Sequence, residues 1–357
     1  MKKIFLGAIF MASTILAKPT IYILTTGGTI GGISDSPLNA NYTSASFDIN
    51  KTIQNMPELN DIALLKSEEV ANVGSQAMNN EIMINLADKV NKLLVKNDVD
   101  GVVITHGTDT MEESVYFLNL VVKSKKPIVF TGAMRTQNSK SSDAELNLFN
   151  AISVAANPQS REKGAVVVIN DEIHAAREVS KTNTTALNSF SSPNSGKIGT
   201  VHYGKVNFYL SPIRKHTTDS IFNIKDIKEL PKVDILYSHS DDNAEFVKSA
   251  VSNGAKGIIV AGMGNGNLYP SVEKELDNAS KNGIIIVRSS RTGSGNTSVG
   301  GEVKNENFIT SDNLNPQKAR ILLMLALNKT DDKAKIQEFF NTHWYLKICK
   351  FVNLRFY

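Results

Sequence analysis

Two glycine-containing loops of this chain each place threonine hydroxyls directly after a short apolar run. The first loop, residues 25–32, reads Thr-Thr-Gly-Gly-Thr-Ile-Gly-Gly. Glycine lets backbone amides approach a ligand closely, and Thr29 adds a hydroxyl in the same turn. The loop lacks the Lys-Ser/Thr pair of a P-loop and does not match GxGxxG. It therefore favours a ligand other than a nucleotide, with a purely structural turn as the alternative.

The second loop carries a hydroxyl and a carboxylate side by side, at Thr108 and Asp109. Thr110 and Glu113 have the spacing of a capping box, which predicts a helix beginning near Met111. Thr108 and Asp109 would then lie in the exposed turn before this helix. The alternative role for Asp109 is that of a simple helix cap.

A threonine nucleophile needs a base, and the chain offers no convincing Ser-His-Asp order. Lysine can serve once burial or a nearby cation lowers its pKa. Lys181, between Arg177 and Thr185 in Arg-Glu-Val-Ser-Lys-Thr-Asn-Thr-Thr, is the candidate. The residues alone do not separate it from the other lysines. For His106 we favour a buried imidazole with satisfied hydrogen bonds.

The histidines and the cysteine do not suggest a metal site. The 6 histidines show neither HExxH nor any other close ligand pairing, and the only cysteine is Cys349. A disulfide framework, a thiolate zinc site and a cysteine nucleophile in a core loop are therefore disfavoured.

The formal net charge of +4 arises at the two ends of the chain. Lys2, Lys3, Lys347, Lys350 and Arg355 lie there, and no acid accompanies them. The body between is close to neutral. It lacks the basic excess that a nucleic-acid-binding surface needs, so no nucleic-acid partner is expected.

Short runs rich in Ile and Val recur along the body with amphipathic segments between them. Runs that are apolar throughout are typical of strands buried on both faces of a parallel sheet, which predicts an α/β fold. The expected strands span residues 21–25, 101–105, 127–131, 165–169, 233–237, 257–261 and 283–287, and the expected helices span 82–94, 244–253 and 272–279. Such sheets build their sites at the carboxyl ends of the strands, where both threonine loops are expected.

The sequence divides into five segments. Basic residues, an apolar run and Ala17 give residues 1–17 the pattern of a secretory signal, too short to span a bilayer comfortably, which predicts export to a periplasm. A buried first helix is the alternative. We expect an N-terminal domain at 18–209, a linker without clear periodicity at 210–231 and a C-terminal domain at 232–341. The aromatic, basic tail at 342–357 is either a membrane-surface contact or a poorly fitting extension or edge strand.

Five motifs in order resemble the bacterial type II L-asparaginases over nearly the whole chain from Lys18 to Asn341. They are Thr26-Gly-Gly-Thr29-Ile, Ile104-Thr-His-Gly-Thr108-Asp109-Thr-Met-Glu-Glu113, Lys181-Thr-Asn-Thr-Thr185, Gly264-Asn-Gly-Asn267-Leu-Tyr269 and Leu314-Asn-Pro-Gln-Lys-Ala-Arg320. The resemblance implies a two-domain asparaginase/glutaminase-type fold. Its larger N-terminal domain would have a flavodoxin-like parallel sheet, and its smaller C-terminal domain would be parallel α/β. It also implies hydrolysis of L-asparagine to L-aspartate and ammonia, without a metal or cofactor.

The resemblance assigns catalytic roles residue by residue. Thr29 falls on the nucleophile of the family, and Tyr42 on the residue that helps to activate it. Thr108, Asp109 and Lys181 match a second set, in which the lysine polarises or deprotonates Thr108 and helps to activate the water of deacylation. Packing of the loop is the alternative role for Tyr42.

Substrate binding is assigned in the same way. Ser75 and Gln76 match positions that, together with Asp109, hold the α-carboxylate and α-amino groups of the substrate. Asn267 and Glu302 match residues that enter the site from a neighbouring subunit, which implies a homotetramer of two intimate dimers. The alternatives are a helix cap for Ser75 and a solvated acid for Glu302.

Some questions stay open at the level of the sequence. Leu94 and Ser124 occupy the positions of a disulfide that some family members form, so that bridge is absent. Residues 33–41 match the hinge of the family's mobile lid, but the preference between asparagine and glutamine is not readable from them. A dual glutaminase-asparaginase, a periplasmic amino-acid-binding protein and a cytoplasmic asparaginase are the rival interpretations.

Overall fold

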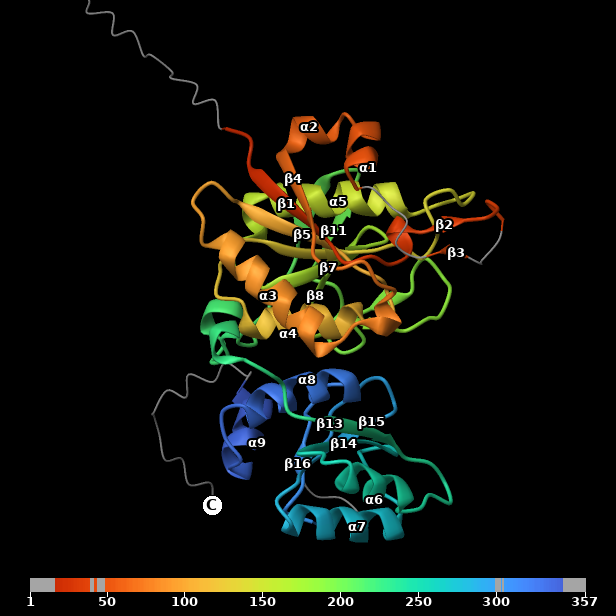
Figure 1. Ribbon diagram of the computed structural model, residues 1–357, viewed down its shortest axis with the longest axis vertical. Coiled ribbons are helices and arrows are strands. Elements are labelled where there is room, and N and C mark those ends of the chain that lie inside the picture. Colours follow the sequence, from red (N-terminus) through yellow and green to blue (C-terminus); the bar gives the residue numbers. More distant parts are fainter. Residues whose placement is uncertain (1–16, 39–41, 44–48, 299–302, 304, 343–357) are drawn as a thin grey trace, which may run out of the picture.

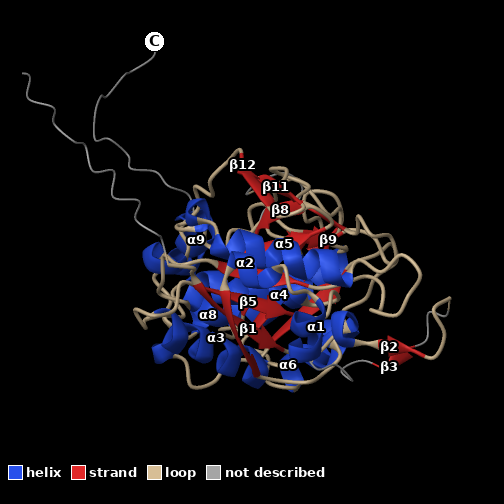
Figure 2. Cartoon of the chain, turned by 90° about the horizontal axis from the view of Figure 1, so that it is seen from above, coloured by secondary structure: helices blue, strands red, loops and turns tan. Residues whose placement is uncertain are grey.

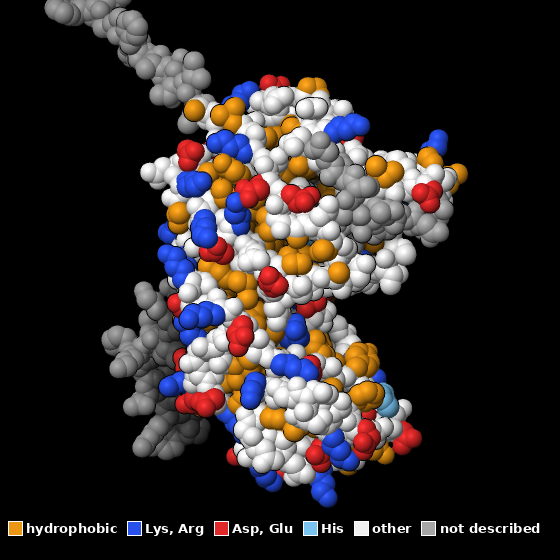
Figure 3. Space-filling view, in the orientation of Figure 1, with side chains coloured by type: hydrophobic (Ala, Val, Ile, Leu, Met, Phe, Trp, Pro, Cys, Tyr) orange, Lys and Arg blue, Asp and Glu red, His pale blue; other side chains and the backbone are white. Residues whose placement is uncertain are grey.

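The computed structural model describes residues 17–38, 42–43, 49–298, 303 and 305–342, which form two α/β units (Figure 1). The expected signal segment, apart from Ala17, and the expected tail beyond residue 342 lie outside the described residues. Within the described part, no helix is both long and apolar enough to cross a membrane. On the face shown in Figure 3, basic and acidic side chains are interspersed.

The N-terminal unit is built on an 8-stranded sheet. Its strands are β1 (Thr20–Thr25), β4 (Leu64–Glu69), β5 (Gly101–Thr105), β6 (Ile128–Thr131), β7 (Ala165–Ile169), β8 (Glu172–Ala175), β11 (Gly199–His202) and β12 (Lys205–Phe208). Their order is β12-β11-β8-β7-β6-β5-β1-β4. The segment from β4 to β7 in this order is parallel throughout. The predicted α/β architecture with a parallel core is therefore confirmed.

The far edge of this sheet differs from the parallel arrangement that we expected. Strands β8, β11 and β12 add to β7 in antiparallel fashion. Two hairpin turns explain the reversals between β7 and β8 and between β11 and β12, because Asn170, Asp171, Tyr203 and Gly204 in these turns all have positive φ. Two-residue turns with positive φ match the twist of antiparallel strands. The larger sheet is thus mixed.

Helices cover both faces of the sheet, as Figures 1 and 2 show. One face carries α3 (Asn80–Leu94) and α4 (Met111–Val121), and the other carries α1 (Ile49–Asn55), α2 (Leu59–Ile62) and α5 (Ala144–Ala156). In β5, Val102 and Ile104 join the cluster on the first face while Val103 joins the second cluster. Burial on both faces is the reason why these strands are apolar throughout.

The smaller elements lie in the connections of this unit. They are η1 (Thr29–Gly31), β2 (Ile33–Ser34), β3 (Tyr42–Thr43), η2 (Ser75–Ala77), η3 (Pro158–Ser160), β9 (Ser180–Lys181), β10 (Phe190–Ser191), η4 (Thr217–Asp219) and η5 (Ile224–Asp226). The hairpin of β2 and β3 projects from one side of the unit (Figures 1 and 2).

The C-terminal unit has a 4-stranded parallel sheet in the order β13-β14-β15-β16. Its strands are β13 (Val233–Tyr237), β14 (Gly257–Gly262), β15 (Ile285–Ser290) and β16 (Ile309–Thr310), and its helices are α6 (Glu245–Ser252), α7 (Pro270–Lys281), α8 (Pro316–Leu327) and α9 (Lys333–Thr342). Helix α8 packs against α4 of the N-terminal unit, and one hydrophobic cluster contains Val115 of α4 and Leu322 of α8. The two units therefore share buried apolar surface next to α4.

Candidate active site

A pocket of about 400 Å³ at the carboxyl ends of β1 and β5 brings together most of the predicted site residues. This edge is where open parallel sheets bind ligands. Its lining residues are Gly28, Thr29, Gly74, Ser75, Gln76, Gly107, Thr108, Asp109, Met134, Lys181 and Thr184.

Close contact between glycine backbones holds the two threonine loops together. Gly27 and Gly28 have φ of +98° and +91°. A Cβ on Gly28 would lie 2.4 Å from the Cα of Gly107, and a Cβ on Gly27 would lie 2.4 Å from the carbonyl oxygen of Val73. Only glycine permits both this backbone conformation and this approach. Thr29, which is 8% exposed, follows directly and begins η1.

Lys181 connects the second loop to a strand outside the main sheet. Its Nζ donates to Thr108 Oγ1 at 2.9 Å and to Asp109 Oδ1 at 2.6 Å, where it forms an ion pair. Thr108 is buried, whereas 58% of the Asp109 side chain is exposed. The arrangement places a lysine between a hydroxyl that it can polarise and a carboxylate that remains accessible to a ligand.

Ser75 supports the second loop and helps to line the pocket. Its Oγ accepts a hydrogen bond from the Asp109 backbone N–H at 3.1 Å. Its carbonyl oxygen accepts from Thr110 Oγ1 at 2.8 Å, so the expected capping box does not form, although α4 begins at Met111 as predicted. Helix α3 is capped by Asn79 instead of Ser75, which removes the helix-cap alternative for this serine.

His106 is a core imidazole, as expected from the sequence. It is fully buried, and its Nδ1 lies 2.7 Å from the Gly107 carbonyl oxygen, to which it donates. Its Nε2 lies 2.9 Å from Ser114 Oγ and accepts from that hydroxyl. Burial lowers the pKa of His106 to about 4. The ring is therefore neutral near pH 7 and structural in role.

Three predicted site residues are not placed in this pocket. Tyr42 has its backbone in β3, opposite Ser34, and its side chain lies outside the described residues. Glu302 also lies outside them. Asn267 belongs to the C-terminal unit, where it pairs with Met263, and it is not among the described residues that line the pocket.

The hairpin of β2 and β3, which contains the expected lid hinge, is tied to the loop after β6. Asn138 Oδ1 accepts from the Ser34 N–H at 3.0 Å, and Asn138 Nδ2 donates to the Ser34 carbonyl oxygen at 2.7 Å. A second hollow of about 460 Å³ lies beside the first and shares Thr29, Met134 and Thr184 with it. This hollow is also lined by Pro37 and Leu38, which follow β2, so the pocket extends toward the hairpin.

The sequence reasoning missed Met134, Thr184 and the buried Glu112 behind the second loop. Met134 follows β6 at the same edge of the sheet, so the rule about strand ends could have found it. Thr184 lies in the same segment as Lys181. Glu112 is surrounded by residues distant in sequence, and no local pattern identifies such a position.

Comparison with known proteins agrees with this geometry. The family model "Asparaginase, N-terminal" matches residues 20–214, and "Glutaminase/Asparaginase C-terminal domain" matches residues 232–340. L-asparaginase 2 of Escherichia coli (strain K12) is 46% identical over 96% of this chain and 99% of its own length. A probable periplasmic L-asparaginase of Haemophilus influenzae is 44% identical over 90% and 92%. The structure of a probable cytoplasmic L-asparaginase from Campylobacter jejuni is similar, with TM-score 0.89, 45% identity and coverage of 91% and 100%.

The low pKa of His106 predicts a defined loss of stability in acid. Between pH 6.5 and 4 the unfolded chain binds a proton at this position that the folded chain does not. The free energy of unfolding of wild type should therefore fall by up to about 3 kcal/mol more than that of His106→Gln over this range. Urea titrations of both proteins at several pH values measure the difference. Parallel pH dependences would contradict the assignment.

Proposed function

Because this chain belongs to the asparaginase family, we propose that the pocket at the carboxyl ends of β1 and β5 is its active site. The chain is an asparaginase, an amidohydrolase that converts L-asparagine to L-aspartate and ammonia. One observation carries the assignment of the site, namely that Thr29 lines the same pocket as Thr108, Asp109 and Lys181. An amino-acid-binding protein without catalytic activity would not need a second threonine hydroxyl, that of Thr108, hydrogen-bonded to a lysine.

The proposed chemistry proceeds through an acyl-enzyme. Thr29 Oγ attacks the side-chain amide carbon of asparagine, with Tyr42 helping to take the proton. The C–N bond then breaks, and ammonia leaves with the proton from the hydroxyl. Backbone amides of the glycine-rich loop and the Thr108 loop stabilise the oxyanion. Water, activated through Thr108 and Lys181, finally hydrolyses the ester on Thr29.

The same pocket offers groups for the amino-acid end of the substrate. The exposed carboxylate of Asp109 is placed to take the α-ammonium group. Ser75 Oγ accepts from the Asp109 N–H, so its own hydrogen can be donated to the α-carboxylate. Gln76 lines the pocket and is exposed, so its amide can add a second donor.

The site is proposed to be completed by a neighbouring subunit. Asn267 and Glu302 would enter from that subunit, in a homotetramer of two intimate dimers. Asn267 is not among the described residues that line the pocket of its own chain, which supports this arrangement. So do apolar side chains exposed on the C-terminal unit, since Tyr237 on β13 is 65% exposed and Phe246 on α6 is 67% exposed.

Export to the periplasm is the proposed location. The signal pattern of residues 1–17 supports it, and one relative is named a periplasmic enzyme, whereas one structural neighbour is named cytoplasmic. We retain residues 18–209 and 232–341 as the proposed domains, with the linker at 210–231.

Ammonia release from the purified full chain tests the substrate. We expect saturable turnover of L-asparagine. A kcat/KM for glutamine at least roughly a hundredfold lower, which corresponds to about 2.7 kcal/mol of discrimination, would identify an enzyme selective for asparagine. A coupled assay over a range of concentrations of each amide measures this. Comparable values would instead identify a dual glutaminase-asparaginase. Stoichiometric binding without ammonia would indicate an amino-acid-binding protein.

Subunit complementation tests the shared site. Thr29→Ala and Glu302→Ala should each be inactive alone, the first because it lacks the nucleophile. When the two chains are unfolded together and refolded, hybrid oligomers contain sites with an intact Thr29 and an intact Glu302, and activity should return. Differently tagged chains allow hybrids to be purified. Inactive hybrids would show that each site is built from one chain.

A further inference from the structure

Glu112 is a buried carboxylate directly behind the second threonine loop. It lies in the first turn of α4, shortly after Asp109, and is 3% exposed. It is not among the described residues that line the pocket, so it does not face the substrate there. Its contacts lie on the opposite side, toward β9 and α8.

One set of contacts holds the strand that carries Lys181. Glu112 Oε1 accepts from the Lys181 backbone N–H at 3.4 Å, and Oε2 accepts from Ser180 Oγ at 3.0 Å. Strand β9 consists of only 2 residues and pairs with β10 on one edge. The carboxylate is thus a second anchor for the backbone from which the Lys181 side chain extends to Thr108.

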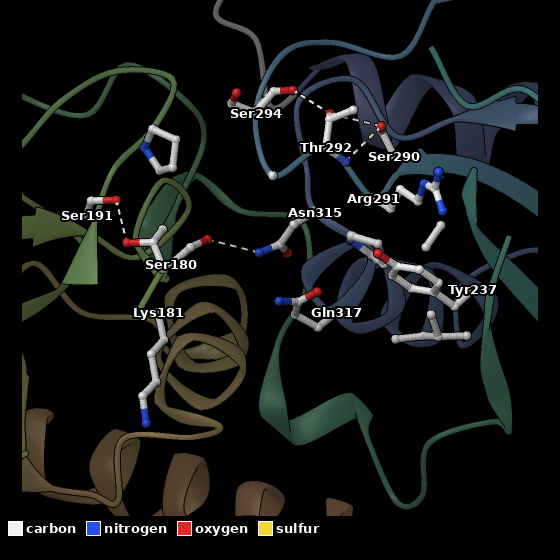
Figure 4. A pocket seen from close by; sticks show the side chains of 16 residues that line it. Ser180, Lys181, Ser191, Tyr237, Ser290, Arg291, Thr292, Ser294, Asn315 and Gln317 are labelled. Atoms are coloured by element: carbon white, nitrogen blue, oxygen red, sulfur yellow. Dashed lines mark hydrogen bonds between the residues drawn. The ribbon is translucent and has the colours of Figure 1, made fainter. Parts of the chain in front are cut away.

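The other set of contacts comes from the N-terminal end of α8, in the C-terminal unit. Asn315 Nδ2 donates to Glu112 Oε2 at 2.6 Å, and Gln317 Nε2 donates to Oε1 at 3.3 Å. Asn315 Nδ2 also donates to Ser180 Oγ at 3.0 Å. Figure 4 shows this Asn315–Ser180 contact and the Lys181 side chain extending away from it.

The groups that contact the Glu112 carboxylate are all hydrogen-bond donors, and one further neighbour, Lys318, is a cation. Lys318 Nζ lies 3.7 Å from Glu112 Oε2, and burial lowers the pKa of Lys318 to about 8, while Glu112 opposes this shift. Lys318 is therefore mostly protonated at neutral pH. Position 112 requires two acceptor oxygens. A glutamine there would replace one of them with an NH₂ group, which would face other hydrogen-bond donors. Leaving a buried charge without its partner is costly.

We propose that Glu112 is the positioning residue of Lys181. Its hydrogen bonds link the strand that carries this lysine to the N-terminal end of helix α8. The inference rests on the proposed catalytic role of Lys181. Since Asn315, Gln317 and Lys318 all belong to the C-terminal unit, the geometry of the lysine depends on how the two units pack. The C-terminal unit thereby contributes to the site of its own chain without touching the substrate.

Glu112→Gln tests the proposal. We expect kcat to fall about 10- to 100-fold because Lys181 loses its alignment with Thr108, while KM changes less than about threefold. Glu112→Asp, which keeps the acceptors, should recover part of kcat. Gln317→Ala, at a half-buried position, removes one support and should lower kcat mildly in a folded protein. Steady-state ammonia release and thermal unfolding are measured for each variant.

Glu113→Gln is the matched control. Glu113 is the neighbouring carboxylate in the same helical turn, it pairs with Arg320 at 3.9 Å, and burial raises its pKa to about 7. Its variant should keep kcat within about twofold. Equal kcat losses in both variants, or a normal kcat in Glu112→Gln and Gln317→Ala, would overturn the proposal.

Lys181→Met separates this inference from the proposed function. If Lys181→Met is inactive while Glu112→Gln is normal, the lysine is catalytic and only the positioning role fails. If Lys181→Met keeps near-normal activity, the catalytic role of the lysine fails first, and the positioning role fails with it.

Discussion

The site depends on the contact between two backbones at the carboxyl ends of β1 and β5. Gly28 and Gly107 approach so closely that a Cβ on the first would overlap the second, and a Cβ on Gly107 would lie 2.6 Å from Ser75 Oγ. The two glycine loops thus pack backbone to backbone, and the side chain of Ser75 packs directly against Gly107. This packing brings Thr29, Ser75 and the Thr108 loop to one pocket, where a small amino acid can meet all of them. Larger residues at the two glycines would separate these groups.

The lysine reaches this pocket from a separate part of the structure. Strand β9 is short and lies outside the main sheet. It is held by β10, by the buried carboxylate of Glu112 and by Lys318 Nζ, which donates to the carbonyl oxygen of the preceding Val179. That carboxylate in turn accepts hydrogen bonds from Asn315 and Gln317 at the N-terminal end of α8. The C-terminal unit therefore has two roles in this account. It is proposed to position Lys181 of its own chain through Glu112, and to supply Asn267 and Glu302 to a neighbouring chain.

The sequence predicts the parallel core well, because strands covered on both faces are apolar throughout, as in β5 and β7. It does not predict strands β4, β11 and β12, whose half-exposed residues carry little hydrophobic signal. The capping-box spacing located the start of α4 correctly, but Thr110 bonds to Ser75, which is distant in sequence. The role of Glu112 is likewise not predictable from the sequence. This residue lies inside a recognisable motif, yet its partners are contributed by β9 and α8, and such contacts leave no local pattern.

The central claim is that Thr29 is the nucleophile of the pocket built by these loops. Rapid acid quenching during turnover of L-asparagine, followed by peptide mass spectrometry, tests it most directly. The account predicts an aspartyl ester on the peptide that contains Thr29, formed no later than ammonia is released. An ester on the Thr108 peptide would contradict the account, because the two threonines would then exchange roles. Ammonia release without any ester at early times would contradict the acyl-enzyme itself.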